Sequence, residues 1–134
     1  MEEIQFNIRQ GPVQDFDTLH INQSKKHING YINAYRFIDR DTKQFVIYLP
    51  SVEISGYGET SEKAGEMVKE SLSDLFASFL KMSLSELDNE LRRLGWKKDK
   101  FRNKEFSNPL INIQGKLKEL NADNDNVERL ALVA

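Results

Sequence analysis

The segment from Gln44 to Leu80 constrains the fold more than any other part of the chain. It opens with a short apolar run, Phe45 to Leu49, which stops at Pro50. Proline has no backbone N–H, so it cannot continue the hydrogen-bonded ladder of a strand. A second extended run, Val52 to Tyr57, follows. The pattern predicts two neighbouring strands, with Gly56 as a bulge in the second.

A capped amphipathic helix is predicted to follow directly, over residues 61–81. Thr60 or Ser61 supplies a hydroxyl for the unpaired N–H groups of its first turn. Apolar residues then recur at intervals of three and four, which is typical of a helix that buries one face. They are Ala64, Met67, Val68, Leu72, Leu75, Phe76, Phe79 and Leu80. Gly65 lies in the helix interior, where glycine costs about 1 kcal/mol relative to alanine. We therefore expect the helix backbone to approach a strand closely at Gly65.

The residues upstream predict further strands. Residues 2–9 alternate between apolar and polar side chains, which is a strand pattern. Residues 31–38 are rich in aromatic and β-branched side chains and also predict a strand. The polar residues after them have the length of a hairpin turn. Residues 14–30 have few apolar anchors, so we expect a loop, with a short strand near residues 19–21.

The residues downstream predict a second helix and a hairpin. Ser83 and Glu86 have the spacing of a capping box, a leucine stripe extends to Leu94, and Gly95 ends the helix. The chain from Trp96 onward predicts a second hairpin, then a brief helix over residues 116–120, a solvated linker and a short docking segment at the end.

Together these elements predict an α+β fold. We expect an antiparallel sheet of three or four strands packed on the long helix, followed by a small helix–hairpin unit. The predicted division is an α+β domain over residues 1–82 and a C-terminal helix–hairpin extension over residues 83–134, packed on the first. A length of 134 residues is typical of a compact domain.

The composition is that of a soluble globular protein, with 39% hydrophobic and 30% charged residues. No apolar run approaches the roughly 20 residues needed to cross a bilayer. The acidic start of the chain lacks the pattern of a signal peptide. The chain contains no cysteine, which excludes disulfides and thiolate metal sites. We expect a cytoplasmic protein that has no contact with a membrane.

Positive charge is concentrated between residues 92 and 104, where seven residues are basic and one is acidic. These seven form the basic cluster: Arg92, Arg93, Lys97, Lys98, Lys100, Arg102 and Lys104. Such side chains bind phosphates through counterion release, and the interleaved Trp96, Phe101 and Phe106 could stack on bases. In the alternative interpretation the cluster is a solvated helix end and hairpin, its arginines favoured by the helix dipole and Trp96 a core anchor.

Aromatic side chains of the first hairpin suggest a second candidate surface. If the long helix covers one face of the sheet, the opposite face stays exposed and favours dimerisation or partner binding. The candidate interface residues are Tyr31, Tyr35, Phe37 and Tyr48. An equally weighted alternative is that the helix over residues 84–94 covers this face.

No catalytic or metal-binding constellation can be assembled from the sequence. His20 and His27 lie in a polar segment without the carboxylates and rigid frame that a metal site needs. Asp39 and Asp41 belong to the hairpin turn, where aspartate is common. We expect no cofactor and no enzymatic activity.

The segments Phe45 to Pro50 and Gly58 to Ala64 resemble the HicB-like antitoxin domain. That family has a strand ending in aromatic-x-Pro, a further strand, and then Gly-x-Thr leading into a helix rich in Glu and Ala. The resemblance extends roughly from Tyr31 to Leu80, about a third of the chain. It departs at Glu53-Ile54, where the family usually has Pro-Gly.

The resemblance implies a partial ribonuclease-H-like domain without catalytic carboxylates. It also implies a homo-oligomer that binds a small toxin protein. Residues 91–97 are loosely similar to the opening of the HicA toxin, but residues 102–106 lack the histidine that toxin uses, so no nuclease activity is implied. The leading hypothesis is a non-enzymatic HicB-like protein that acts through protein–protein contact in a toxin–antitoxin pair. The alternative is a nucleic-acid-binding module that binds DNA or RNA through the basic cluster.

Overall fold

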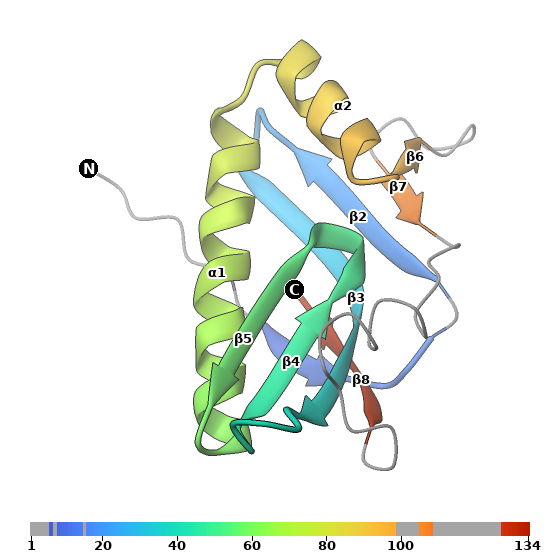
Figure 1. Cartoon of the computed structure of the whole chain (residues 1–134). Coiled ribbons are helices and arrows are strands. Elements are labelled where there is room, and N and C mark those ends of the chain that lie inside the picture. Colours follow the sequence, from blue (N-terminus) through green and yellow to red (C-terminus); the bar gives the residue numbers. More distant parts are fainter. Residues whose placement is uncertain (1–5, 7, 15, 99–104, 109–126) are drawn as a thin grey trace.

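Along the chain, strands lie before and after two consecutive helices (Figure 1). The computed structural model describes residues 6, 8–14, 16–98, 105–108 and 127–134. In chain order the elements are β1 (Arg9–Gly11), β2 (Asp17–Asn22), β3 (His27–Ile38), β4 (Phe45–Leu49), the 3-10 helix η1 (Pro50–Val52), β5 (Ile54–Gly58), α1 (Ser61–Lys81), α2 (Leu84–Arg93), β6 (Lys97–Lys98), β7 (Glu105–Asn108) and β8 (Glu128–Val133).

The strands form a single antiparallel sheet of eight strands that forks at β3. One edge of β3 pairs with β8, which pairs in turn with β1. Along the other edge, the first part of β3 pairs with β2 and the last part pairs with β4. One branch continues from β2 to β7 and β6, and the other continues from β4 to β5.

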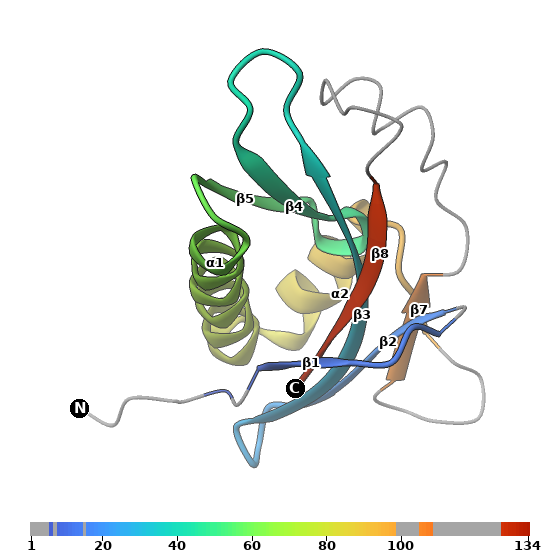
Figure 2. The same cartoon turned by 90° about the horizontal axis from the view of Figure 1, so that it is seen from below.

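Both helices lie on the same face of this curved sheet (Figure 2). The α+β class and the packing of an antiparallel sheet on the long helix are as predicted. The sheet has more strands than the three or four expected, because β2 from the predicted loop, the β6–β7 pair and β8 from the last residues all join it. Neither described helix has the length and hydrophobicity of a membrane span.

The prediction of a loop over residues 14–30 is wrong, although the short strand expected near residues 19–21 is present within β2. Residues 17–22 form β2, and β3 already begins at His27. Leu19, Ile21 and Ile28 are buried, while polar residues alternate with them on the other face. This alternation is the period-two pattern of a strand with one exposed face. The strand predicted over residues 2–9 lies mostly outside the described residues, as do the predicted helix over residues 116–120 and the linker after it.

Helix α1 begins and packs as the sequence predicts. The Thr60 hydroxyl accepts a hydrogen bond from the Lys63 backbone N–H at 3.2 Å, which caps the first turn. The apolar stripe faces the sheet, and six of its residues are buried: Ala64, Val68, Leu72, Phe76, Phe79 and Leu80.

The closest approach between α1 and the sheet occurs at a strand glycine. A Cβ atom on Gly56 would lie 2.8 Å from the Ala64 carbonyl oxygen and 3.0 Å from the Val68 backbone nitrogen. Gly56 pairs in regular register with Ile47, so the predicted bulge is absent there. The close approach predicted at Gly65 is also wrong, because a Cβ on Gly65 would meet only the Ile47 Cδ1 atom at 3.9 Å.

Helix α2 has the predicted signals at both ends. The Ser83 hydroxyl accepts from the Glu86 backbone N–H at 3.1 Å, and the Glu86 carboxylate accepts from the Ser83 backbone N–H. At the C-terminus, Gly95 has a φ of 92°. The Trp96 N–H then donates to the Leu91 carbonyl at 2.9 Å, which closes a Schellman motif. This turn directs the chain into β6.

The predicted domain division at residue 82 stays a prediction. Strand β7 hydrogen-bonds to β2 and β8 to β3, so strands from both predicted segments take part in the same sheet. The last residues of the chain, expected to be a docking segment, form the buried strand β8.

Candidate functional site

The basic cluster is divided between two elements. Arg92 and Arg93 lie in the last turn of α2, and Lys97 and Lys98 form β6. The remaining three residues of the cluster, Lys100, Arg102 and Lys104, lie outside the described residues. The structure therefore places four of the seven predicted cations.

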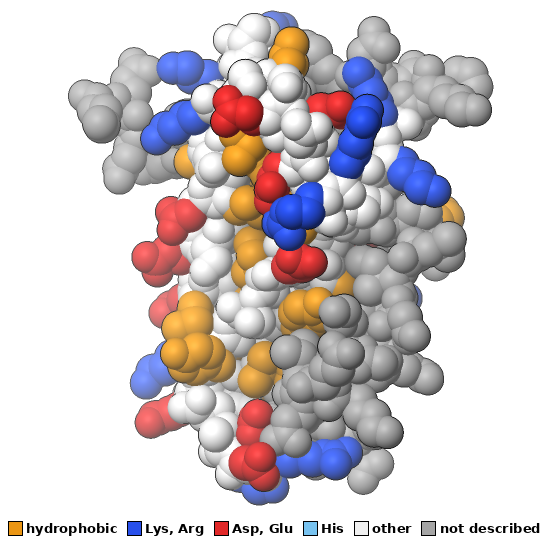
Figure 3. Space-filling view, turned by 45° about the horizontal axis from the view of Figure 1, so that its top comes forward, with side chains coloured by type: hydrophobic (Ala, Val, Ile, Leu, Met, Phe, Trp, Pro, Cys, Tyr) orange, Lys and Arg blue, Asp and Glu red, His pale blue; other side chains and the backbone are white. Residues whose placement is uncertain are grey.

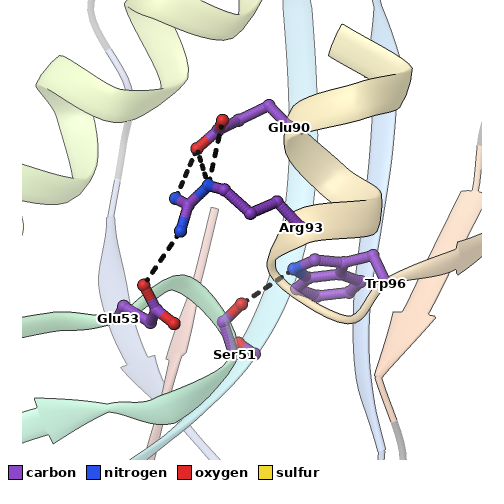
Figure 4. A network of polar contacts seen from close by, with 5 residues as sticks. All are labelled: Ser51, Glu53, Glu90, Arg93 and Trp96. Carbon is purple, nitrogen blue, oxygen red and sulfur yellow. Dashed lines mark hydrogen bonds and ion pairs between the residues drawn. The ribbon is translucent and has the colours of Figure 1, made fainter.

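Both arginines of the cluster form ion pairs with carboxylates. The Arg93 guanidinium bonds to the Glu90 carboxylate at 2.6 Å and to the Glu53 carboxylate at 3.3 Å (Figure 4). These hydrogen bonds raise the pKa of Arg93, the ones to Glu90 having the largest effect, and Arg93 lowers the pKa of Glu90. Arg92 pairs with Asp88 at 3.0 Å. The positive charge at the end of α2 is thus largely compensated, partly by Glu53, which is distant in the sequence.

Trp96 is a core anchor. Its side chain is 3% exposed, and the indole Nε1–H donates to the Ser51 carbonyl at 2.9 Å (Figure 4). Stacking on a base requires an exposed ring face, so Trp96 is not available for that role. Together with the pair between Arg93 and Glu53, this bond fastens the end of α2 to η1 and the residue after it.

Lys97 and Lys98 keep their charge exposed. Neither forms an ion pair within the described part of the chain. They border a surface groove of about 290 Å³, which is also lined by Leu91 and Trp96. Within the predicted nucleic-acid surface, these two lysines are the described basic residues that form no ion pair, so they can contact an anion.

The aromatic residues of the first hairpin are mostly buried. Tyr31, Phe37 and Tyr48 are 8% exposed or less, and Tyr35 is half-buried. The premise that these side chains form an exposed face is therefore not met at the three buried positions. Their role as an interface stays a prediction.

Helix α2 does not bury these aromatic side chains. Its own buried residues, Leu87 and Leu91, join the core on the α1 side of the sheet. Phe37 and Tyr48 form a separate cluster, against which Val46 packs. The row that contains Phe37 and Val46 continues across the sheet to Tyr57 of β5, whose side chain is 57% exposed. Exposure on this face therefore lies at its β5 rim.

A buried carboxylate, missed in the sequence, fills the fork of the sheet. Pairing of β3 with β2 ends at Tyr31, and pairing with β4 begins at Tyr35. Between them, the backbone N–H and side-chain Nδ2 of Asn33 donate to Asp17 Oδ1 at 3.1 and 2.7 Å. The Asp17 side chain thus replaces the strand partner that Asn33 lacks on this edge.

Burial raises the pKa of Asp17, and its hydrogen bonds and the charge of Arg129 partly oppose this effect. Arg129 is held nearby because its Nη2 donates to the Gln14 carbonyl at 2.7 Å. The Asn33 side chain donates to the same carbonyl at 2.9 Å. The contacts of this cluster close the fork, and a structural role accounts for them. Asp17 fell within a predicted loop, so only its place in the fold reveals it.

The other titratable residues considered from the sequence lie in a turn and in two strands. Asp39 accepts from the backbone N–H groups of Asp41 and Thr42, both at 2.9 Å, as predicted for a turn residue. Across the described residues, no group of three or more His, Cys, Asp or Glu side chains could hold a metal ion. His20 of β2 lies opposite Asn29, and His27 of β3 lies opposite Asn22, so the two histidines are not paired with each other.

The geometry defines an α+β protein in which an antiparallel sheet carries both helices on one face. No protein-family model, curated protein or solved structure matches the chain. Two surfaces of the chain carry exposed groups that suit a partner. They are Lys97 and Lys98 on β6, and Tyr57 on β5.

Proposed function

We propose that this chain is a non-enzymatic, HicB-like protein that acts through protein–protein contact, as an antitoxin or a diverged relative of one. The observation that carries the proposal is the order β3, β4, β5, α1, with antiparallel pairing and a Thr60 cap. This is the order expected of a HicB-like domain. In the proposal, residues 83–134 are a helix–hairpin extension, and the protein works as a homo-oligomer in the cytoplasm.

The departure from the family pattern coincides with a contact between the residue after η1 and the end of α2. Glu53 follows η1 in the left-handed conformation, with a φ of 54°. Its carboxylate bonds to Arg93 at the end of α2. The position where the family usually has proline therefore holds the extension against the β3–β5 unit. This supports a HicB-like core that has been adapted to carry a second element.

The distribution of exposed groups favours a protein partner over a nucleic acid. Tyr57 presents a large apolar surface at the β5 rim. In the basic cluster, by contrast, Arg92 and Arg93 are paired with carboxylates and Trp96 is buried. Binding to phosphates depends on unpaired cations, and this surface offers few among the described residues.

Co-expression tests the proposal. The tagged chain is produced together with each protein encoded by a flanking gene, and the masses of the purified complexes are measured. We expect a stoichiometric complex with a small basic protein. Charge reversal at Lys97 and Lys98 should leave this complex intact. A monomer that purifies without any partner contradicts the proposal.

Nucleic-acid binding is the second candidate, and the exposed lysines of β6 favour it. Here the double change Lys97→Glu and Lys98→Glu should abolish binding to generic DNA or RNA while the melting temperature stays nearly constant. Wild-type binding should weaken steeply with added salt. If the wild-type Kd at low salt is in the millimolar range or weaker, this candidate is wrong.

A further inference from the structure

Strand β5 is an edge of the sheet whose own residues carry none of the usual protection. Within the described residues it pairs with β4 alone, in an unbroken register from Ile54 to Gly58. Edge strands are commonly guarded by charged side chains, prolines or bulges. The β6 edge fits this rule, because it consists of Lys97 and Lys98. The five residues of β5 include no charge and no proline.

The outward amide groups of β5 have only a weak partner. The Tyr57 N–H donates to Met67 Sδ of α1 at 3.4 Å, so it points away from β4. Antiparallel pairing alternates along a strand, so the Ser55 N–H also points outward. A thioether is a weak acceptor on a flexible side chain. A peptide carbonyl could therefore displace Met67 and bond to these amides.

An added strand would also cover apolar surface. Tyr57 lies opposite Val46, which lies opposite Phe37, so the three form one row across the sheet. Phe37 is buried and Val46 half-buried, whereas Tyr57 is exposed. A strand paired with β5 would extend this row and take Tyr57 out of water, which is favourable for an apolar partner side chain.

The helix beside this edge is acidic. Met67 marks the side of α1 that borders β5, and Glu70 and Asp74 follow it at intervals of three and seven residues on that side. Both carboxylates are exposed, and neither forms an ion pair with a described residue. Lys63, on the same side, is paired with Glu59 at 3.8 Å. Figure 3 shows acidic side chains next to exposed hydrophobic ones on the side where α1 lies.

The negative charges of Glu70 and Asp74 favour a basic partner segment over a second copy of this chain. If a second copy paired its own β5 here, the same unpaired carboxylates would face each other, and like charges disfavour such a contact. A basic extended segment of another protein would instead complement them. The same segment could supply the apolar residue that meets Tyr57.

We propose that the β5 edge binds an extended segment of a partner protein by strand addition. In this segment apolar residues alternate along the strand and meet Tyr57, and lysine or arginine lies beside Glu70 and Asp74. Main-chain hydrogen bonds to Ser55 and Tyr57 supply affinity, and the flanking charges supply selectivity. The inference rests on the proposed protein-contact function and specifies where contact occurs and which chemistry it requires.

Selection from a phage-displayed library of random twelve-residue peptides tests the site on the full chain. We expect enriched peptides that alternate apolar residues and carry Lys or Arg. Ser55→Pro removes one outward N–H without disturbing the β4 ladder, and should weaken peptide binding by roughly tenfold. Glu70→Lys should weaken it several-fold. Its matched control, Glu62→Lys, makes the same charge change about 140° around the helix from Met67 and should have little effect on binding.

The variants separate the alternatives. Melting temperatures near the wild-type value show that each variant is folded, and the Glu70→Lys result stands even if Ser55→Pro fails to fold. The proposal is overturned if no peptide is enriched, if the enriched peptides are acidic, or if all variants bind equally. A dimer that Ser55→Pro dissociates would assign the edge to a second copy and also overturns it. If Ser55→Pro leaves a complex with a co-expressed basic protein intact, this site is wrong and the protein-contact function stands.

Discussion

Substitution of Gly56 by alanine tests how the sheet and α1 fit together. The added Cβ would lie 2.6 Å from Val68 Cγ2, 2.8 Å from the Ala64 carbonyl oxygen and 3.0 Å from the Val68 backbone nitrogen. Two of these atoms belong to the backbone of α1 and cannot rotate away. Gly56 is not among the glycines with positive φ, so the cost arises from lack of space and not from backbone strain.

The magnitude follows from the cost of overpacking. Inserting a methyl group into a close-packed interior typically costs about 1–3 kcal/mol, and contact with backbone atoms indicates the upper end. Unfolding entropy is about 2.1 cal/mol/K per residue, or roughly 0.28 kcal/mol/K for this chain. A loss of about 3 kcal/mol therefore lowers the melting temperature by roughly 10 °C. Thermal unfolding followed by circular dichroism measures this change.

Gly65→Ala is the matched control. Its Cβ would meet only Ile47 Cδ1 at 3.9 Å, which is an ordinary contact. Alanine is better than glycine in a helix interior by about 1 kcal/mol, so this variant should melt roughly 3 °C above the wild type. The reasoning is refuted if Gly56→Ala melts within about 2 °C of the wild type, or if both variants shift in the same direction.

Three further changes test other parts of the structure. Burial raises the pKa of Asp17 above 3.8, so its contribution to stability is present at low pH and lost as the pH rises through the folded-state pKa. The difference in unfolding free energy between Asp17→Asn and the wild type, measured with urea, should therefore shift in favour of the variant between pH 4 and pH 7. A difference that stays constant over this range would contradict the reasoning. Trp96→Phe removes the donor to the Ser51 carbonyl and should cost about 1–3 kcal/mol in urea unfolding; no loss would show that the bond is not formed. Thr60→Ala removes the cap on the Lys63 N–H and should cost about 1 kcal/mol by the same method, whereas an unchanged midpoint would argue against the cap.

The parts of the fold that the sequence predicts well depend on local signals. Pro50 ends β4, Thr60 starts α1, and Ser83 and Gly95 bound α2. Each of these residues acts on backbone groups within a few positions. Their effect can therefore be inferred without knowledge of the tertiary structure.

The parts that the sequence does not predict depend on distant contacts. The sequence predicts only a short strand near residues 19–21, and pairing with β3 and β7 extends it over residues 17–22. The close approach to α1 falls on Gly56 and not on Gly65, because it depends on how the strand crosses the helix. Asp17 is explained only by the fork of the sheet.

The contacts of the candidate site also depend on residues that are distant in the sequence. A run of basic residues predicts a positive surface, but the sequence does not show that Arg93 meets Glu53, 40 positions away. Nor does it show that Trp96 bonds to the backbone of Ser51, 45 positions away. These contacts convert much of the predicted nucleic-acid surface into a structural link between α2 and η1.

Hydrogen–deuterium exchange on the full chain, with and without its co-expressed partner, tests the central claim most directly. If the chain acts through protein contact at the β5 edge, exchange should slow in β5 and along the Met67 side of α1, while Lys97 and Lys98 exchange as before. A complex that protects only β6 and the end of α2, or a chain that forms no complex at all, would contradict this account.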